Sequence, residues 1–332
     1  MVYIYRKIVN GKPYYYLRIS EKLGKKTITK DIAYLGDSIE QVKRELSKIG
    51  KYKKEIHKSY KIINNFIEKN HYLEQIKGLK LKKDLFLDEK LSEVESCKLH
   101  FNSQFRKLDN LTKLEIWKYF LIEFAFNTTS IEGNTIKLNE VRNLLEEGKT
   151  PKNRTLREIY DLQNHEKVFF ELLKDKTEIS HDLITGIHER LMINIDPRTG
   201  YRTRDVRVLN ARFKSTPAPY VKTDMNLLIK WYTQNRDKLH PLVLASIFHH
   251  QFEKIHPFMD GNGRTGRILF NFILMKHKYP PIIIHNKNRS FYLEALRTAD
   301  SSYLNEVKND SYIKLIKYLA DEMISSYWDI FL

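Results

Sequence analysis

The sequence of 332 residues has a single cysteine, Cys97, and lacks any apolar run that approaches the roughly 18 residues of a membrane-spanning helix. One cysteine excludes a disulfide framework and a thiolate metal cluster, so a reducing compartment is the expected environment. The chain begins with a tyrosine-rich polar stretch that does not have the pattern of a signal peptide. We therefore expect a cytoplasmic protein with no membrane contact.

Hydrophobic residues make up 42% of the chain and include 20 Tyr and 17 Phe. This supply can fill a sizeable core, which excludes a disordered chain, and the length suits about two domains. Charge is uneven, because residues 1–110 hold 25 Lys and Arg against 14 Asp and Glu, whereas residues 111–332 hold 33 against 27. A basic N-terminal segment favours a nucleic acid or an acidic protein as partner, although lysines on helix faces also simply keep a surface hydrated.

Three segments are predicted along the chain. Residues 1–36 alternate around an Asn10-Gly11 turn, which predicts a small basic β-meander. Residues 37–110 carry apolar residues three or four apart among many lysines, which predicts connector helices. Residues 111–332 form the main domain, where we expect helices within 111–129, 138–145, 154–173, 180–196, 223–236, 242–252, 264–278, 289–299 and 311–324.

The helical pattern is interrupted between Gly200 and Pro219. Arginine and valine residues from Arg202 to Val208 indicate an extended segment, and an irregular return follows it. This pattern predicts a β-hairpin or flap inside the helical domain.

The most informative stretch is HPFMDGNGRTGR, from His256 to Arg267. The Gly-Asn-Gly segment 261–263 can adopt unusual backbone angles that turn successive N–H groups inward, which forms a nest for phosphate oxygens. The apolar run that follows makes Arg264 the opening of a helix, whose N-terminal amides point at the same place. Arg264 and Arg267 lie three residues apart, on one side of the first turn, where two guanidinium groups can grip a polyphosphate.

One carboxylate, Asp260, stands among these cations. Without a metal ion, this carboxylate would repel a bound anion. Its presence therefore indicates a Mg²⁺ ion that bridges the carboxylate and the phosphates. His256 titrates near neutrality and can take a proton from an incoming hydroxyl. Each piece alone has an ordinary explanation as a helix end, a turn or a solvated face, but their succession within twelve residues favours a catalytic anion site.

This stretch resembles the signature of the Fic family, His-x-Phe-x-Asp/Glu-Gly-Asn-Gly-Arg-x-x-Arg, at every specified position. The resemblance covers roughly residues 111–324. It implies a mainly α protein, with a Fic-fold helical domain and a β-hairpin flap that follow the small N-terminal β-meander and the connector helices. The matching residues are His256, Phe258, Asp260, Gly261, Asn262, Gly263, Arg264 and Arg267.

The resemblance also implies roles for these residues. Fic proteins mostly transfer AMP from ATP to a hydroxyl of a target protein and release pyrophosphate. In that reaction His256 would be the base, Asp260 would hold Mg²⁺, and Tyr292 would line the adenine side. The segment Val206, Arg207 and Val208 would dock the target as an added strand. The nucleotide phosphates would be bound by Gly261, Asn262, Gly263, Arg264 and Arg267.

A second stretch, residues 128–134 (TTSIEGN), lies upstream. Taken alone, it is a helix end followed by a turn, with ordinary capping residues. Beside the signature, it resembles the inhibitory motif Ser/Thr-x-x-x-Glu-Gly/Asn of the family, matched by Thr128, Glu132 and Gly133. The resemblance implies that Glu132 pairs with Arg267 and competes with the γ-phosphate of ATP, so that the chain inhibits itself.

The resulting hypothesis is an autoinhibited protein adenylyltransferase, a nucleotidyltransferase that uses ATP and Mg²⁺ to modify a Ser, Thr or Tyr hydroxyl of a partner or of itself. One alternative is removal of AMP by the same site, with Glu132 orienting a water. Another is a nucleic-acid-binding regulator that acts through residues 1–110. Such proteins commonly form homodimers, but neither an interface, nor the target, nor the preferred nucleotide is evident in the sequence.

Overall fold

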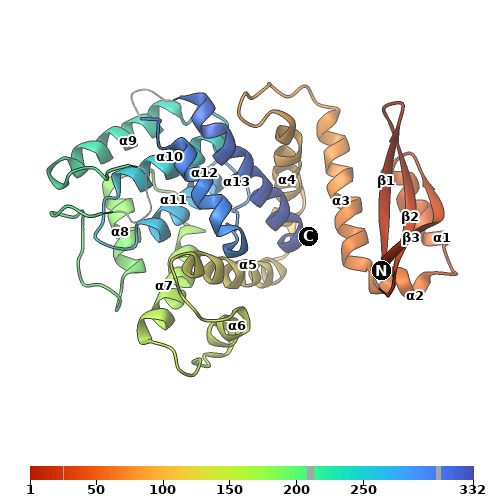
Figure 1. Cartoon of the computed structure of the whole chain (residues 1–332), viewed down its shortest axis with the longest axis horizontal. Coiled ribbons are helices and arrows are strands. Elements are labelled where there is room, and N and C mark those ends of the chain that lie inside the picture. Colours follow the sequence, from red (N-terminus) through yellow and green to blue (C-terminus); the bar gives the residue numbers. More distant parts are fainter. Residues whose placement is uncertain (25, 208–212, 304–307) are drawn as a thin grey trace. The chain divides into compact units, whose positions relative to one another are not determined.

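Two compact units make up the chain, residues 1–81 and residues 82–331 (Figure 1). None of the helices in the described ranges combines the length and the apolar character needed to cross a membrane. The computed structural model describes residues 1–24, 26–207, 213–303 and 308–332.

The first unit contains a three-stranded antiparallel sheet in the order β1-β2-β3, which confirms the predicted meander. Its first hairpin turns at Asn10 and Gly11, whose φ angles of 50° and 76° are the left-handed values that a tight two-residue turn requires. The second hairpin pairs Leu23 with Lys26. The strands are β1 (Val2–Val9), β2 (Lys12–Leu23) and β3 (Lys26–Gly36).

Helices follow the sheet, and α1 and α3 pack on one of its faces. Ser38 caps α1 by accepting a hydrogen bond from the Gln41 N–H group. The helices are α1 (Ile39–Lys48), α2 (Lys53–Lys58) and α3 (Tyr60–Lys77). The shared core consists of Val2, Ile4, Tyr15, Leu17, Leu35, Ile39, Val42, Ile63 and Ile67.

The second unit is built from helices around α10, in which every residue from Leu242 to Phe252 is buried. A helix that is buried on all sides belongs at the centre of a domain. α11 packs against α10, and the signature loop connects the two. The helices are α4 (Leu91–Ser103), α5 (Asn110–Ile131), α6 (Leu138–Glu147), α7 (Leu156–Leu172), α8 (His181–Leu191), α9 (Val221–Asn235), α10 (Pro241–Ile255), α11 (Asn262–Lys276), α12 (Arg289–Ala299) and α13 (Asn309–Ile330).

α5 carries the inhibitory stretch and is longer than its sequence pattern predicted. Asp109 begins the helix by accepting hydrogen bonds from two backbone N–H groups at 3.0 Å. The helix continues to Ile131, so that Thr128 lies inside its last turn and Glu132 is the C-cap residue. The helix geometry therefore fixes the spacing between these two side chains.

The last helix, α13, also extends beyond its predicted end at residue 324. Aromatic packing explains the extension, because the Phe331 ring lies 5.0 Å from that of Phe105 and 5.4 Å from that of Trp117. Tyr327 joins the same cluster, 5.3 Å from Phe331. Such aromatic pairs add stability beyond the burial of their area.

Packing divides the segment predicted as connector helices, residues 37–110. α1 to α3 pack within the first unit, whereas α4 packs against α13 in the second. Glu95 of α4 also lies 3.0 Å from the Nε2 atom of His240, which precedes α10. The compact units of the structure divide near residue 82. The predicted modules, residues 1–36, 37–110 and 111–332, are functional modules and stay a prediction.

Candidate active site

His256 lies at the end of α10 in a left-handed backbone conformation, with φ 53° and ψ 60°. Such angles are strained for a residue with a Cβ atom and persist only where the surroundings hold them. The Nε atom of the buried Arg202 donates to the His256 carbonyl oxygen at 2.7 Å, and its backbone N–H donates to the Pro257 carbonyl at 2.9 Å. Arg202 therefore fixes the turn that carries His256.

The ring of His256 is arranged as a proton acceptor. Its Nδ1 atom lies 3.3 Å from the Glu253 carbonyl oxygen, and because a carbonyl only accepts, the proton is assigned to Nδ1 and Nε2 keeps its lone pair. Burial lowers the pKa of His256, and the Glu253 carbonyl only partly opposes this. The ring is neutral near pH 7, which is the form that a general base needs.

Asn262 closes the signature loop. Its Oδ1 atom accepts a hydrogen bond from the Phe258 N–H group, and its Nδ2 atom donates to the Phe258 carbonyl, both at 2.9 Å. Its side chain is therefore engaged within the loop. The predicted contact of Asn262 with phosphates would come from its backbone N–H, in the first turn of α11.

His188 of α8 supports the same loop. Its ring stacks on Phe258 with centroids 3.7 Å apart, and its Nε2–H donates to the Asp260 carbonyl at 3.0 Å. Burial lowers the pKa of His188 to about 4, so the ring stays neutral. Gly261, with φ 77°, comes so close to Met192 that a Cβ atom would overlap the Met192 sulfur, and this Cβ atom would also contact the His188 ring. Sequence reasoning missed His188, which has no local motif.

Two arginines bind the carboxylate of Asp260. Arg264 donates to Oδ1 at 3.0 Å, and Arg157 of α7 donates to Oδ2. Arg264 is buried and also donates to Asp161 of α7 at 2.7 Å. Burial alone would raise the pKa of Asp260, but the arginines and the Gly261 N–H group outweigh it and lower the pKa. The carboxylate is therefore ionised.

Asp260 fits the requirements of a Mg²⁺ ion. Mg²⁺ binds proteins through one or two carboxylates and completes its coordination with water and phosphate oxygens, so one ionised carboxylate beside an anion site is sufficient. The described part of the chain has no cluster of three metal-ligating side chains. Arg157 is bonded to Oδ2, so an ion at that oxygen would have to displace its guanidinium.

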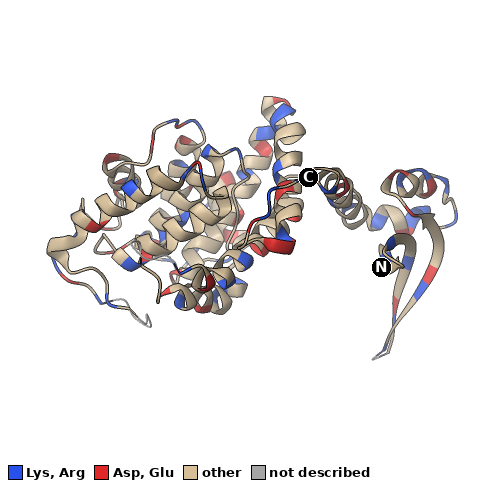
Figure 2. Ribbon diagram, turned by 90° about the horizontal axis from the view of Figure 1, so that it is seen from above, with Lys and Arg blue, Asp and Glu red and all other residues tan. Residues whose placement is uncertain are grey.

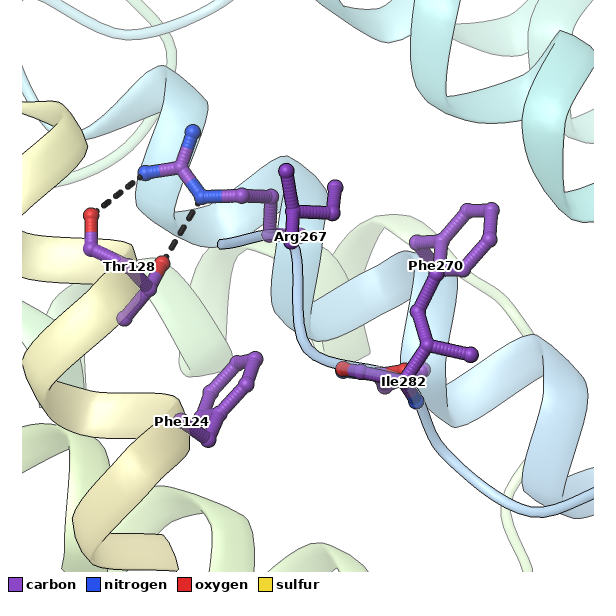
Figure 3. Close-up of a pocket in the computed structure, with 7 residues that line it drawn as sticks. Phe124, Thr128, Arg267, Phe270 and Ile282 are labelled. Atoms are coloured by element: carbon purple, nitrogen blue, oxygen red, sulfur yellow. Dashed lines mark hydrogen bonds between the residues drawn. The ribbon is translucent and has the colours of Figure 1, made fainter. Parts of the chain in front are cut away.

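Arg267 is buried and has other partners (Figure 3). Its Nε atom donates to Thr128 Oγ1 at 2.7 Å, and its Nη2 atom donates to the Thr128 carbonyl at 3.0 Å and to Glu132 Oε1 at 2.7 Å. Burial alone would lower the pKa of Arg267, but the Glu132 carboxylate outweighs it and raises the pKa. The structure thus brings Glu132 to Arg267, and Arg264 and Arg267 have separate partners despite their spacing.

The Glu132 carboxylate lies against the first turn of α11. A Cβ atom at Gly263 would overlap this carboxylate and the Arg267 guanidinium, so a larger residue there would force the ends of these two side chains to move. The first N–H groups of a helix have no partner within the helix, and they attract anions. Glu132 therefore places a negative charge where the sequence predicted a phosphate.

Glu132, Gly263 and Arg267 line one cavity of about 220 Å³, and His256 is also in its wall. Pockets for small-molecule ligands usually have volumes of roughly 300–1,000 Å³, so the cavity is small while the Glu132 carboxylate lies in it. The hydroxyl of Tyr292, a residue predicted near the adenine, is buried 2.5 Å from His249 Nε2. The lining residues include Glu132, Glu253, His256, Gly263, Arg267, Arg289, Tyr292, Leu293 and Leu296.

Glu253 of α10 was not singled out from the sequence. Burial raises its pKa to about 8, Arg267 opposes the shift and Glu132 adds to it. Its Oε1 atom is buried and has no hydrogen-bond partner among the described residues. The sequence does contain a signal for Glu253, because it is an acidic residue in a largely apolar helix, three positions before His256.

The predicted flap is described only in part, because Val208 lies outside the described residues. The flanks that are described, residues 200–207 and 213–217, form no strand. They are joined by side chains instead, since Ser215 Oγ donates to the Val206 carbonyl at 2.8 Å and Arg202 Nη2 donates to the Thr216 carbonyl. Val206 and Arg207 therefore lie in an irregular segment, and the predicted hairpin is absent from these flanks.

Comparison with known sequences supports the resemblance seen in the signature. Residues 178–274, which include the signature, match the Fic/DOC family. Residues 178–274 are thus a Fic/DOC domain by similarity. The expectation drawn from His256 to Arg267 is thereby confirmed at the level of the family.

Curated relatives of this Fic/DOC domain are adenylyltransferases by name. The chain is 31% identical over 224 residues to protein adenylyltransferase fic-1 of Caenorhabditis elegans, an alignment that covers 63% of this chain and 44% of that protein. It is 32% identical over 186 residues to protein adenylyltransferase Fic of Drosophila grimshawi, covering 54% and 38%. The chain thus spans less than half the length of the curated relatives it matches.

Solved structures show the same fold. A Fic domain containing signaling protein from Bacteroides thetaiotaomicron superposes with a TM-score of 0.64 at 26% identity, covering 70% of this chain and 94% of that one. Fic-1 of C. elegans (residues 134–508) superposes with a TM-score of 0.61 at 26% identity, covering 72% and 70%. The mainly helical Fic fold expected from the sequence is confirmed.

The competition at Asp260 can be tested with Mn²⁺ as a spectroscopic substitute for Mg²⁺. We expect Arg157→Gln to lower the Mn²⁺ concentration at half-saturation by up to about fivefold, because a largely exposed ion pair contributes at most about 1 kcal/mol. Electron paramagnetic resonance of free Mn²⁺ measures this binding, with the same concentration of ATP in the samples with and without protein so that chelation by ATP itself is subtracted. Arg236→Gln, which removes an arginine paired with Glu178, is the control. Weaker binding in Arg157→Gln would contradict the competition.

The raised pKa of Glu253 predicts a pH-dependent stability. The folded protein keeps the proton up to about pH 8, whereas the unfolded chain releases it near pH 4.5, so this contribution to stability is complete below pH 4.5 and is lost as the pH rises to 8. The glutamine side chain in Glu253→Gln cannot ionise, so the variant does not lose this stability as the pH rises. We expect the variant and the wild type to unfold alike near pH 5, and the variant to be more stable at pH 9 by a few kcal/mol, since one pKa unit is about 1.4 kcal/mol.

Thermal and urea unfolding at the two pH values measure this difference. A constant offset between the proteins from pH 5 to pH 9 would show that Glu253 is ionised throughout.

Proposed function

We propose that this chain transfers AMP from ATP to a hydroxyl of a protein and that Glu132 inhibits the transfer. The observation that carries the proposal is the position of the Glu132 carboxylate. It is bound to Arg267 at 2.7 Å, lies against Gly263 at the start of α11, and shares a cavity with the neutral ring of His256. A site that holds a carboxylate in this way has the charge and the N–H groups to hold a phosphate.

His256 would be the general base of the reaction. The target hydroxyl would attack the α-phosphorus and pass its proton to Nε2 of His256, the P–O bond to the β-phosphate would break, and pyrophosphate would leave. The Nδ1–H to Glu253 carbonyl contact orients the ring for this step. Phosphoryl and nucleotidyl transfer depend mainly on positioning and charge stabilisation, which agrees with the residue types at the site.

The phosphates would be bound by groups that the structure already holds near the start of α11. The N–H groups at 261–263 would bind the inner phosphates, although that of Gly261 donates to Asp260 Oδ1 at 2.6 Å in the structure. Arg264 and Arg267 would bind the outer phosphates, and Tyr292 would lie near the adenine. A Mg²⁺ ion on Asp260 would neutralise charge on the leaving pyrophosphate. Val206 to Val208 would dock the target. The relatives named protein adenylyltransferase support ATP as the nucleotide.

Inhibition follows from competition for one guanidinium. While Arg267 binds Glu132, it cannot bind the γ-phosphate, and the triphosphate is excluded from the pose in which the hydroxyl attacks in line. Because Glu132 belongs to the same chain as the signature, the inhibition of AMP transfer would be intramolecular. We extend the proposal to a cytoplasmic enzyme that modifies Ser, Thr or Tyr of a partner or of itself and that can form a homodimer.

Labelled-ATP transfer by three proteins tests both the chemistry and the inhibition. We expect wild type to label itself or proteins of a lysate weakly, and Glu132→Gly to label them on the order of tenfold more or better, since tenfold corresponds to only about 1.4 kcal/mol. Adding His256→Ala to Glu132→Gly should reduce labelling by about 10²–10⁴-fold, the usual contribution of a general base. ATP binding by calorimetry confirms that each variant still binds nucleotide.

Glu132→Asp is the matched control, because it keeps the charge but shortens the reach to Arg267. If Glu132→Gly binds ATP and labels nothing, AMP transfer is wrong. Release of AMP from a modified protein by wild type, abolished in Glu132→Gln, would instead favour AMP removal. The observation that favours AMP removal is the exposure of the Glu132 side chain, which is 39% exposed and can therefore contact a water molecule.

A further inference from the structure

The β-sheet of the first unit has a second face, which the shared core does not use. Side chains alternate along a strand, and the core residues Val2, Ile4, Tyr15 and Leu17 all point to the face covered by α1 and α3. Their neighbours point to the other face. There the register places Tyr3 opposite Arg18, Tyr5 opposite Tyr16, Lys7 opposite Tyr14, and Tyr16 opposite Tyr34.

These neighbours form an aromatic surface, which we call the tyrosine face: Tyr3, Tyr5, Tyr14, Tyr16 and Tyr34. The Tyr16 and Tyr34 rings lie 5.3 Å apart. The Arg18 guanidinium lies 3.6 Å above the centre of the Tyr5 ring. Tyr34 is 53% exposed, and the other four tyrosines are partly exposed. Five tyrosines on one side of a three-stranded sheet are more than a solvated surface needs.

The charge around this face is positive. Residues 1–81 hold 19 Lys and Arg against 8 Asp and Glu, whereas residues 82–332 hold 39 against 33. The whole excess of the N-terminal region therefore lies in the first unit, where Lys and Arg recur along the strands and helices (Figure 2). Lys7 and Lys12 are exposed beside the tyrosines, and Lys22 is exposed further along β2, where that strand pairs with β3 alone. Asp31, on the same face, is neutralised by Arg18 at 2.6 Å.

We propose that the tyrosine face binds single-stranded nucleic acid. Unpaired bases stack on aromatic side chains and on arginine, and lysines beside the rings bind the phosphates. The bases of a duplex are stacked on one another, and an acidic peptide has no bases. Both would therefore be attracted by the positive charge of the lysines without stacking on the tyrosines. The inference is independent of the proposed AMP transfer, because its residues all lie in the first unit.

The test uses the full chain and a fluorescein-labelled oligothymidine of about 15 nucleotides, a length within the site sizes known for sheet-based binders. Fluorescence anisotropy should show binding at about 50 mM salt that weakens steeply towards about 200 mM. The double variant Tyr5→Ala/Tyr16→Ala should bind at least about fivefold more weakly, because removing one stacked base contact already has an effect of that size.

Tyr5→Phe/Tyr16→Phe keeps the rings and should bind as wild type does, which separates stacking from loss of the hydroxyl groups. Tyr60→Ala, on α3 and 62% exposed, is the control for an exposed tyrosine of the same unit outside the sheet. Lys7→Gln/Lys22→Gln should reduce the slope of log affinity against log salt by about 1.4, which is 0.7 for each phosphate contact with a single strand. Circular dichroism and thermal melting verify that the variants are folded.

Three results would overturn the proposal: no binding at low salt, equal binding by folded wild type and folded Tyr5→Ala/Tyr16→Ala, or equally tight binding of a duplex or a polyglutamate of the same charge. Labelled-ATP transfer by Glu132→Gly, measured on the same preparations, remains a separate readout. Failure of one property therefore leaves the other measurable.

Discussion

The buried guanidinium of Arg267 is the group on which the arrangement of the candidate site depends. A buried cation requires hydrogen-bond acceptors and a negative charge, and α5 supplies both through Thr128 and Glu132. That requirement holds the end of α5 against the start of α11. It also explains why residue 263 is glycine, since any larger residue would separate the pair. The same interaction therefore joins two helices, shapes the cavity and fills the anion position.

Much of this could be predicted from the sequence, because the informative residues are close together along the chain. The spacing from His256 to Arg267 indicates an anion site, and the apolar periodicity indicates the helices around it. The Glu132 contact with Arg267 came from a resemblance to a family and not from any local rule. The structure places the two side chains 2.7 Å apart.

Other features could not be predicted, because they depend on residues that meet only in the folded chain. Arg157 reaches Asp260 from a helix about a hundred residues away in sequence. Asn262 resembles a phosphate ligand in the signature, yet its side chain closes the loop against Phe258. The raised pKa of Glu253 results from the burial of a carboxyl in the wall of the cavity. Periodicity and motif spacing carry no information about such contacts.

Arg202 donates to the carbonyl of His256 and also to that of Thr216, beyond the segment proposed to receive the target. One rigid, planar group thus anchors both the residue proposed as base and the return of the flap. A displacement of Thr216 would therefore act, through Arg202, on the backbone carbonyl of His256. If the proposed reaction holds, a change in the flap that admits another target would also disturb the turn of the proposed base, so Arg202 would couple the range of targets to turnover.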